Sequence, residues 1–324
     1  MKIAVVGSNT IGAYIARKLS ESGNSVDLFE RKPHIGKEAC SGLFSERIWK
    51  YFPEKVSIVK NTITSATVHF PKKTMKLDLS PKMLVFHRGD FDSYATDLAV
   101  KAGAKLHLGA FAKLKSHDKN LVTLETDKKE MEFDYLIACD GSVSTIRREL
   151  KLPDPHFRLG IFFYKPEESN SSFFDVWPTK KGFIWKLPRG KTTEYGIIEE
   201  PDTARKLFDV FCDKNSIKQE KLISAIIPMG LVKPFYGRIA LCGDSIGLTK
   251  PWSGGGVLWG LIAADILVKT FPDFNMYQKQ LKSLFSMRIA RSNLLLKAFP
   301  LVPYLQYFAP AQIHFDADWG PKPF

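Results

Sequence analysis

The first thirty residues constrain the fold of this chain more than any other stretch. Lys2 to Val6 predicts a buried strand, apolar residues then recur at helical spacing as far as Leu19, and Ser25 to Glu30 predicts a second strand. Gly23 and Asn24 are typical of the end of the intervening helix. Because two parallel strands need such a crossover helix, this βαβ unit predicts an α/β protein.

The turn between the first strand and the helix has the sequence Gly7-Ser-Asn-Thr-Ile-Gly12. In a dinucleotide-binding turn, Gly7 would make the tight bend, Gly12 would let helix and strand pack closely, and the helix N-terminus would face a pyrophosphate. Glu30 ends the second strand, where a carboxylate accepts hydrogen bonds from ribose hydroxyls. Asn9 replaces the usual second glycine. Asparagine tolerates left-handed backbone, but its side chain would crowd a pyrophosphate, so an ordinary strand–turn–helix stays equally open.

Two further motifs favour a nucleotide site. Asp140-Gly-Ser-Val-Ser144 follows a strand predicted at Phe133 to Cys139, and Gly243-Asp-Ser-Ile-Gly247 follows a strand predicted at Arg238 to Cys242. Each motif places a carboxylate at the carboxyl end of a strand, which is the edge where open α/β sheets bind ligands. Either alone would be an ordinary turn, but the three motifs together favour FAD.

The remaining patterns predict a second domain. Alternating residues from 61 to 84, and β-forming and aromatic residues from 158 to 200, predict antiparallel strands. Helices are expected from Phe91 to Ala102, with Asp90 as N-cap, and from about Gly255 to Lys269. We therefore expect an α/β fold with a discontinuous Rossmann-type FAD-binding domain and an α+β substrate domain built on a mainly antiparallel sheet. The predicted boundaries are 1–60, 85–155 and 232–275 for FAD, 61–84 and 156–231 for substrate, and 276–324 for a C-terminal helical segment.

Composition limits the partners. The chain carries 47 Lys and Arg against 34 Asp and Glu, a net charge of +13, so its surface attracts anions. It has no basic arm, no RNP-like aromatic string and no metal-ligand spacing, so we expect no nucleic acid and no metal. Its four cysteines are far apart, which fits a reducing compartment. Since Met1 and Lys2 lead directly into the first strand, we expect no signal peptide and a cytoplasmic location.

Three stretches carry a resemblance to a known family. They are Lys37-Glu-Ala-Cys-Ser-Gly-Leu43, Arg88-Gly-Asp-Phe-Asp92 and Gly243-Asp-Ser-Ile-Gly-Leu-Thr-Lys-Pro-Trp-Ser-Gly-Gly-Gly256. They resemble the cysteine loop, the arginine before a helix and the glycine-rich loop of the geranylgeranyl reductases, which include archaeal digeranylgeranylglycerophospholipid reductases. That family belongs to the para-hydroxybenzoate hydroxylase-like flavoproteins. The resemblance covers nearly the whole chain.

This resemblance implies FAD as the cofactor and a set of residues that hold it. The implied cofactor-binding residues are Gly7, Asn9, Ile11, Gly12, Glu30, Arg31, Cys40, Ser41, Gly42, Arg88, Asp140, Gly141, Gly243, Asp244, Gly254, Gly255, Gly256 and Val257. The N–H groups of Gly254 to Gly256 open a helix, so they would face the N1–C2=O edge of the isoalloxazine and serve catalysis by stabilising the reduced flavin. Cys40 would lie beside the flavin as a proton donor, a redox thiol or a packing residue.

A fourth stretch resembles the motif that lines the isoprenoid pocket of that family. Phe183-Ile-Trp-Lys-Leu-Pro188 retains its Trp and final Pro, whereas Lys180, Phe183 and Leu187 replace a Pro, a Tyr and a Phe. The resemblance implies substrate contacts from Phe183, Trp185, Pro188 and Trp252. An ordinary core strand is the alternative.

The expected function is reduction of carbon–carbon double bonds in a geranylgeranyl chain of a lipid or prenyl diphosphate, as in lipid biosynthesis. A flavin monooxygenase or halogenase, which uses the same nucleotide motifs, is one alternative, and a flavoprotein that binds lipid or a partner without turnover is another. The electron donor, NAD(P)H or a ferredoxin-type protein, stays open. The apolar stretch Leu294 to Pro310 is broken by Lys297, Pro300 and Pro303, so we expect no spanning helix. Within it, we expect Leu294 to Phe308 to serve either core packing or peripheral membrane contact.

Overall fold

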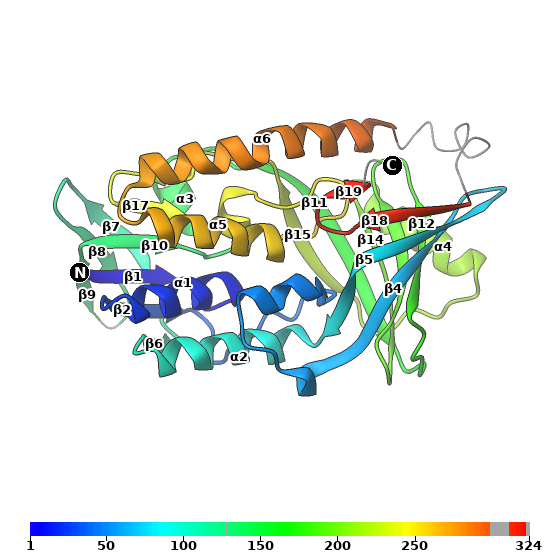
Figure 1. The fold of residues 1–324 in the computed structure, drawn as a ribbon, viewed down its shortest axis with the longest axis horizontal. Coiled ribbons are helices and arrows are strands. Elements are labelled where there is room, and N and C mark those ends of the chain that lie inside the picture. Colours follow the sequence, from blue (N-terminus) through cyan, green and yellow to red (C-terminus); the bar gives the residue numbers. More distant parts are fainter. Residues whose placement is uncertain (128, 299–310, 322–324) are drawn as a thin grey trace.

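The computed structural model describes residues 1–127, 129–298 and 311–321. The chain forms a six-stranded sheet and a ten-stranded sheet. Figure 1 shows the first near the N-terminus and the second at the opposite end of the molecule. The six-stranded sheet is parallel except for its edge strand β16. In order across the sheet, its strands are β16 (Phe235–Tyr236), β17 (Ile239–Leu241), β10 (Tyr135–Ala138), β1 (Lys2–Val6), β2 (Ser25–Glu30) and β6 (Lys105–Leu108).

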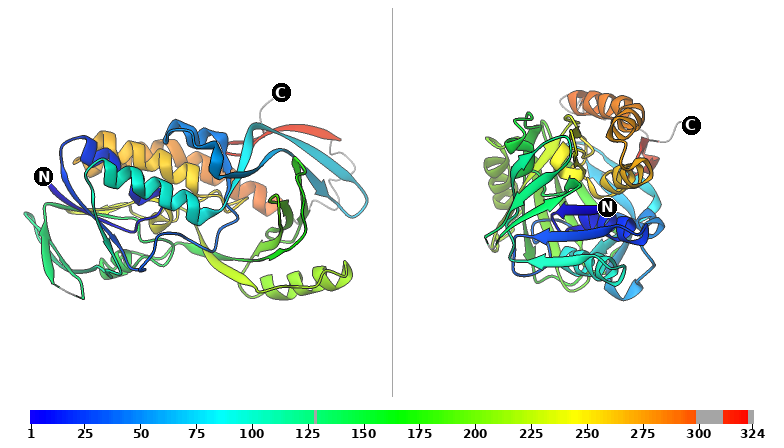
Figure 2. Two further views of the ribbon diagram at one scale, coloured as in Figure 1. Left: turned by 90° about the horizontal axis from the view of Figure 1, so that it is seen from below. Right: turned by 90° about the vertical axis from the view of Figure 1, so that its left-hand side faces the viewer.

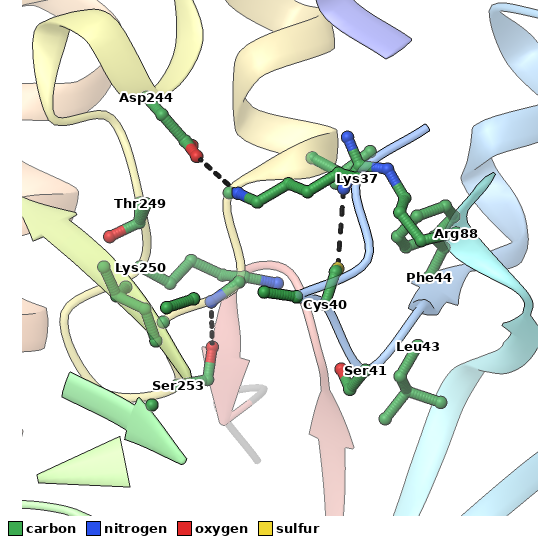
Figure 3. Close-up of a pocket in the computed structure, with 18 of the residues that line it drawn as sticks. Lys37, Cys40, Ser41, Leu43, Phe44, Arg88, Asp244, Thr249, Lys250 and Ser253 are labelled. Carbon is green, nitrogen blue, oxygen red and sulfur yellow. Dashed lines mark hydrogen bonds and ion pairs between the residues drawn. The ribbon is translucent and has the colours of Figure 1, made fainter. Parts of the chain in front are cut away.

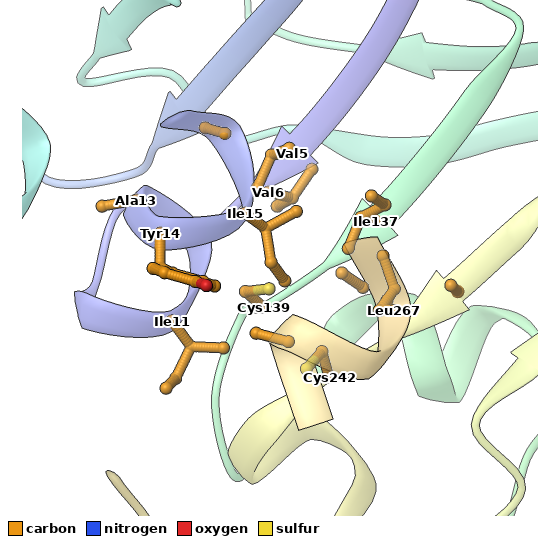
Figure 4. Packing of buried hydrophobic residues seen from close by; sticks show 14 of the residues in the cluster. Val5, Val6, Ile11, Ala13, Tyr14, Ile15, Ile137, Cys139, Cys242 and Leu267 are labelled. Atoms are coloured by element: carbon orange, nitrogen blue, oxygen red, sulfur yellow. The ribbon is translucent and has the colours of Figure 1, made fainter. Parts of the chain in front are cut away.

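Helices cover this sheet and position its ligand-binding edge. They are α1 (Thr10–Glu21), α2 (Arg88–Lys101), α3 (Thr145–Glu149), α5 (Val257–Thr270) and α6 (Phe274–Ala298), with 3₁₀ turns η1 (Glu46–Lys50), η2 (Val56–Ile58) and η3 (Gly243–Ile246). α1 packs on α2 and α5, and α6 lies on the outer side of α5 (Figures 1 and 2). Ile11 of α1 fits against Gly260 of α5, and a Cβ added at Gly260 would lie 2.9 Å from the Cδ1 of Ile11. Figure 4 shows the apolar packing between these helices and the strand ends near Cys139 and Cys242.

Two predicted boundaries differ from the structure. α2 begins at Arg88, three residues before the predicted start, and its N-cap is His87, so Asp90 lies in the first turn. The apolar run predicted as one strand from Phe133 to Cys139 is divided, because β9 (Glu130–Phe133) belongs to a separate antiparallel sheet with β7 (Lys113–His117) and β8 (Val122–Glu125). β10 starts two residues later, since an apolar run alone does not reveal which sheet each part joins.

The ten-stranded sheet is mainly antiparallel. Its order is β15 (Ile223–Met229), β11 (His156–Lys165), β14 (Thr193–Glu199), β13 (Phe183–Pro188), β12 (Phe173–Pro178), β4 (Val59–His69), β5 (Thr74–Phe86), β18 (Gln312–Asp316) and β19 (Gly320–Pro321), while β3 (Leu43–Ser45) pairs with β5. α4 (Ala204–Lys214) buries Phe208 and Cys212 against one face, beside Phe163 and Ile184. The opposite face is left to line a cavity.

The C-terminal segment is only partly helical. The helical segment predicted for 276–324 is wrong over Gln312–Asp316, which forms β18 parallel to β5. Arg47 ties this strand down, with Nη2 2.7 Å from Asp316 Oδ2 and Nη1 2.8 Å from Asp318 Oδ2. Residues 299–308 of the apolar stretch Leu294 to Phe308 lie outside the described residues. Among the described helices, none has the length and hydropathy needed to span a membrane.

Candidate active site

One cavity of about 800 Å³ runs from the carboxyl ends of the parallel strands to the uncovered face of the ten-stranded sheet. It brings together most of the predicted site residues from seven separate stretches of sequence. The predicted residues on its wall are Gly7, Asn9, Ile11, Glu30, Arg31, Cys40, Ser41, Arg88, Asp140, Gly141, Phe183, Trp185, Asp244, Trp252, Gly254, Gly255, Gly256 and Val257. Gly12, Gly42, Gly243 and Pro188 lie behind the wall.

The turn after β1 leaves no room for side chains at its two glycines. Gly7 has φ +104°, and an added Cβ would lie 2.4 Å from Cys139 O. At Gly12 an added Cβ would lie 2.0 Å from Gly7 O. Only glycine permits this close packing of strand, turn and helix, so the backbone is shaped as a dinucleotide-binding turn requires.

Asn9 caps α1. Its φ of −101° is ordinary, so the left-handed backbone that asparagine tolerates is not used here. Its Oδ1 accepts hydrogen bonds from Ile11 N at 3.0 Å and Gly12 N at 3.3 Å, and its Nδ2 donates to Cys139 O at 2.6 Å. Two N–H groups that would otherwise face a pyrophosphate therefore have a partner within the chain.

Two carboxylates at the strand ends suit the hydroxyl groups of a nucleotide. Glu30 is held in place by Ser8 N at 3.2 Å and Lys32 N at 3.0 Å. Asp140 Oδ2 accepts from Ile146 N at 3.1 Å, whereas Oδ1 is buried and has no hydrogen-bond partner among the described residues. Burial raises the pKa of Asp140. A buried oxygen without a donor is costly, so a hydroxyl of a bound ligand fits beside Asp140.

The glycine-rich loop forms the facing wall. Lys37 and Asp244 reach toward each other across this end of the pocket, with Nζ 3.3 Å from Oδ2 (Figure 3). Gly254 N donates to Lys250 O at 2.8 Å and Gly255 N to Ser253 Oγ at 3.3 Å. Two of the three N–H groups predicted to face the flavin are thus bonded within the loop.

Lys250 is a buried cation that the sequence patterns did not single out. Its Nζ donates to Ala317 O at 2.8 Å and lies 3.3 Å from Asp318 Oδ1. An added Cβ at Gly255 would lie 2.9 Å from its Cε, so glycine makes room for this side chain. The lysine therefore joins the glycine-rich loop to the C-terminal strand region. Its position next to the glycine run was the available signal.

Cys40 lies where the cysteine loop meets α2 (Figure 3). Its Sγ is 3.4 Å from Arg88 Nη1 and 3.4 Å from Gly42 N. Arg88 is buried, and its Nε donates to Asp92 Oδ1 at 3.0 Å. Gly42 has φ +64° and would place a Cβ 2.2 Å from Phe86 O, so the loop needs glycine there. The thiol consequently has a cationic neighbour on the cavity wall.

The substrate end is shaped by strand alternation. Phe183, Trp185 and Leu187 of β13 face the cavity, while Ile184 faces α4. Pro188 follows Leu187 and therefore points to the opposite face of the sheet, so the prediction that it lines the cavity is wrong. Its carbonyl accepts from Asn61 Nδ2 at 3.1 Å instead. Trp252 is on the wall, with its ring 5.0 Å from that of Phe315.

The rest of this end is apolar. In the ten-stranded sheet, strands β4, β5 and β11 to β15 place no charged residue on the cavity wall. Besides the residues of β13, the wall residues of these strands are Ala66, Val68, Met75, Leu77, Leu79, Met83, Gly160, Phe162, Phe174, Val176, Pro178, Ile198, Ala225, Ile226, Ile227 and Pro228, and Phe70 joins them from the β4–β5 turn. A long hydrocarbon fits such a wall better than a polar ligand does.

The fold is that of FAD-dependent oxidoreductases with a Rossmann-type domain and a sheet-built substrate domain. No family model matches the chain. It is 22% identical over 352 residues to digeranylgeranylglycerophospholipid reductase 1 of Methanosphaera stadtmanae, and the alignment covers 94% of this chain and 84% of that protein. The similarity to this reductase confirms the predicted resemblance, and the solved structures that follow confirm the predicted fold class.

Two solved structures show how widely the fold is used. A geranylgeranyl bacteriochlorophyll reductase-like protein from Thermoplasma acidophilum superposes with a TM-score of 0.82 at 19% identity, covering 94% of this chain and 90% of that one. The halogenase PltM in complex with phloroglucinol and FAD superposes with a TM-score of 0.70 at 14% identity, covering 92% and 76%. At these identities the likeness establishes the fold, and the chemistry must be argued from the cavity.

Proposed function

We propose that this chain is an FAD-dependent reductase of carbon–carbon double bonds in a geranylgeranyl chain, carried by a lipid or a prenyl diphosphate. The observation that carries the proposal is the continuity of the cavity, which joins a polar nucleotide end to a long uncharged wall of sheet residues. The name of the Methanosphaera relative points to the same substrate class. A hydrocarbon bound along this wall would reach the nucleotide end without crossing water.

The residues present fit FAD. The turn from Gly7 to Gly12 would hold the pyrophosphate, Glu30 the ribose, and the unpartnered oxygen of Asp140 a hydroxyl group. When bound and reduced by an electron donor, FAD would supply a hydride, and one further proton would complete the addition of two hydrogens to the alkene. We assign the role of proton donor to the alkene to the Cys40 thiol, because this thiol lies on the cavity wall beside the Arg88 guanidinium.

We further propose that the substrate end of the molecule meets an anionic lipid surface. The turns β4–β5 and β12–β13 emerge at the same end of the sheet, because β4 and β12 run parallel. They carry Lys72, Lys73, Lys180 and Lys181, next to the wall residues Phe70 and Pro178. Co-sedimentation with phosphatidylglycerol vesicles tests this contact. We expect binding at about 20 mM salt and its loss at about 500 mM salt, because salt screens the attraction between the lysines and the anionic lipid. No binding at low salt would contradict it.

The decisive test of the reaction is a single turnover without an added electron donor. The FAD-loaded protein is photoreduced without oxygen and mixed with digeranylgeranylglyceryl phosphate or geranylgeranyl diphosphate in detergent. We expect mass gains of two hydrogens per reduced bond and matching flavin reoxidation. Photoreduced free FAD and denatured protein are the controls. A monooxygenase or halogenase would leave the lipid unchanged here, and so would a protein that binds lipid without turnover.

A further inference from the structure

A buried ion pair joins the substrate wall to the cysteine loop. Arg189 Nη1 lies 3.2 Å from Glu194 Oε2, and the two side chains are 5% and 0% exposed. Glu194 stands opposite Leu187 in the antiparallel pair β13–β14, so both point to the cavity side of the sheet. A charge pair buried on the substrate side of an otherwise apolar wall is expensive to desolvate, which calls for a specific role.

The acidic partner holds the tryptophan of the wall. Trp185 Nε1 donates to Glu194 Oε1 at 2.7 Å. The indole lies flat on Gly196, where an added Cβ would be 2.3 Å from Trp185 Cζ2. Gly196 beneath the ring and the Glu194 carboxylate at the indole Nε1 together fix the orientation of the Trp185 ring. Burial raises the pKa of Glu194 while Arg189 lowers it, and the net shift is upward.

The basic partner holds the cysteine loop. Arg189 Nη2 donates to Phe86 O at 2.6 Å, and Nη1 donates to Ser41 O. Ser41 follows Cys40, and Phe86 O lies against Gly42, so both carbonyls flank the loop that carries the thiol. The Arg189 guanidinium also covers the ring of Tyr164 at 5.2 Å. Its fork therefore reaches across from the sheet to this loop.

We propose that Arg189 and Glu194 are positioning residues, which set the Trp185 ring and the Cys40 thiol at a fixed separation where the nucleotide end meets the substrate end. The proposal rests on the proposed function for its effect on turnover. A chain laid against Trp185 is then held in one register relative to Cys40, and the register decides which double bond is reduced.

The first test needs no turnover. Cys40 is half-buried and the other three cysteines are buried, so iodoacetamide should label Cys40 first in the FAD-loaded protein. We expect Arg189→Met to speed Cys40 alkylation at least about tenfold, because the loop loses both carbonyl contacts. Glu194→Gln should do so less and should alter the Trp185 fluorescence, read against Trp185→Phe. Arg205→Met, which breaks an exposed pair on α4, is the matched control and should change neither readout.

The second test separates positioning from folding. In Arg189→Lys, one ammonium keeps the charge beside Glu194 but cannot hold both carbonyls. We expect normal FAD content, a KM within about threefold of wild type, a kcat reduced at least about tenfold, and a changed distribution of reduced double bonds. Unchanged Cys40 alkylation together with an unchanged product pattern would overturn the proposal. Absence of lipid reduction in the wild type would reject the proposed function, whereas the alkylation test would still decide whether the pair holds the loop.

Discussion

The two ends of the cavity are built by different means. At the nucleotide end, the carboxylates of Glu30, Asp140 and Asp244 lie at or shortly after strand ends, and Glu30 is fixed by the nearby backbone groups Ser8 N and Lys32 N. At the substrate end, the wall collects alternate residues from strands as distant in sequence as β4 and β18. Chemistry at the first end thus depends on local turns, and shape at the second end depends on long-range strand pairing. Variants should separate these dependences.

The largest effect is expected from a side chain in the nucleotide turn. Gly12→Val would place atoms within 2.0 Å of Gly7 O, and this backbone cannot move away without opening the turn. We expect FAD affinity to fall at least about a hundredfold, as overpacking of a backbone contact implies. Flavin content after purification and titration of apoprotein with FAD measure it. Gly89→Ala in α2 is the control, since its Cβ would have ordinary contacts. A folded Gly12→Val protein with full FAD affinity would show that this turn does not hold the cofactor.

The next effect concerns the strand pairing that completes the substrate end. Arg47→Met leaves Asp316 without its cation and Asp318 with Lys250 as its remaining cationic partner, so we expect the free energy of unfolding to fall by about 3 kcal/mol. Burial raises the pKa of Asp316, but the hydrogen bonds from Arg47, Asp318 N and Trp319 N together with the Arg47 charge outweigh burial, and the net shift is downward. Because the pKa of Asp316 is lower in the folded chain than in the unfolded chain, its carboxylate stabilises the fold at pH values above the ordinary carboxyl pKa. That stabilisation is lost as the pH falls through the pKa of the folded state.

This loss below pH 3.8 should therefore be smaller in Arg47→Met than in wild type. Thermal unfolding between roughly pH 3 and pH 7 measures both the stability and its slope. Arg17→Met, which breaks an exposed pair with Glu21 on α1, should cost less than about 1 kcal/mol. Equal losses in the two variants would mean that β18 is not held by its ion pairs.

A charge on the substrate wall should separate the two ends most clearly. Phe183→Asp puts a carboxylate among uncharged wall residues, so we expect the KM for a geranylgeranyl lipid to rise at least about tenfold. FAD affinity should stay within about twofold, because Phe183 belongs to β13 and to none of the nucleotide-binding motifs. Phe183→Leu keeps the wall apolar and should change KM by less than about threefold. If Phe183→Asp loses FAD as well, the two ends are not independent.

Sequence reasoning succeeded where the signal was local. The βαβ unit, the carboxylates after β10 and β17, and the glycine-rich loop all follow from residues adjacent in sequence, and the structure brings them to one cavity. It failed at Pro188, because the exact phase of β13 depends on its neighbours, and at β18, because five residues acquire strand character only by pairing with β5. Arg189 and Glu194 were missed although a glutamate within an apolar strand was a usable signal.

The smallest expected effect is at Asn9, where the nucleotide end departs from the usual glycine. Its Oδ1 occupies the N–H groups of Ile11 and Gly12, so Asn9→Gly would release both toward a pyrophosphate and remove the crowding side chain. Glycine is a tolerable N-cap and should cost α1 only a few tenths of a kcal/mol. We therefore expect FAD to bind about three- to tenfold more tightly, measured by titration of the apoprotein.

Asn9→Asp sharpens this last prediction. Aspartate caps the same N–H groups but adds a negative charge beside the pyrophosphate, so FAD affinity should fall while α1 stays intact. Opposite shifts in the glycine and aspartate variants would mean that the cap competes with the cofactor for the helix N-terminus. Weaker binding in Asn9→Gly would instead mean that the Asn9 side chain contacts FAD itself. In that case the second N–H of Nδ2 would be the donor to FAD, because the first already donates to Cys139 O, and this one hydrogen bond would hold the side chain in place for the cofactor.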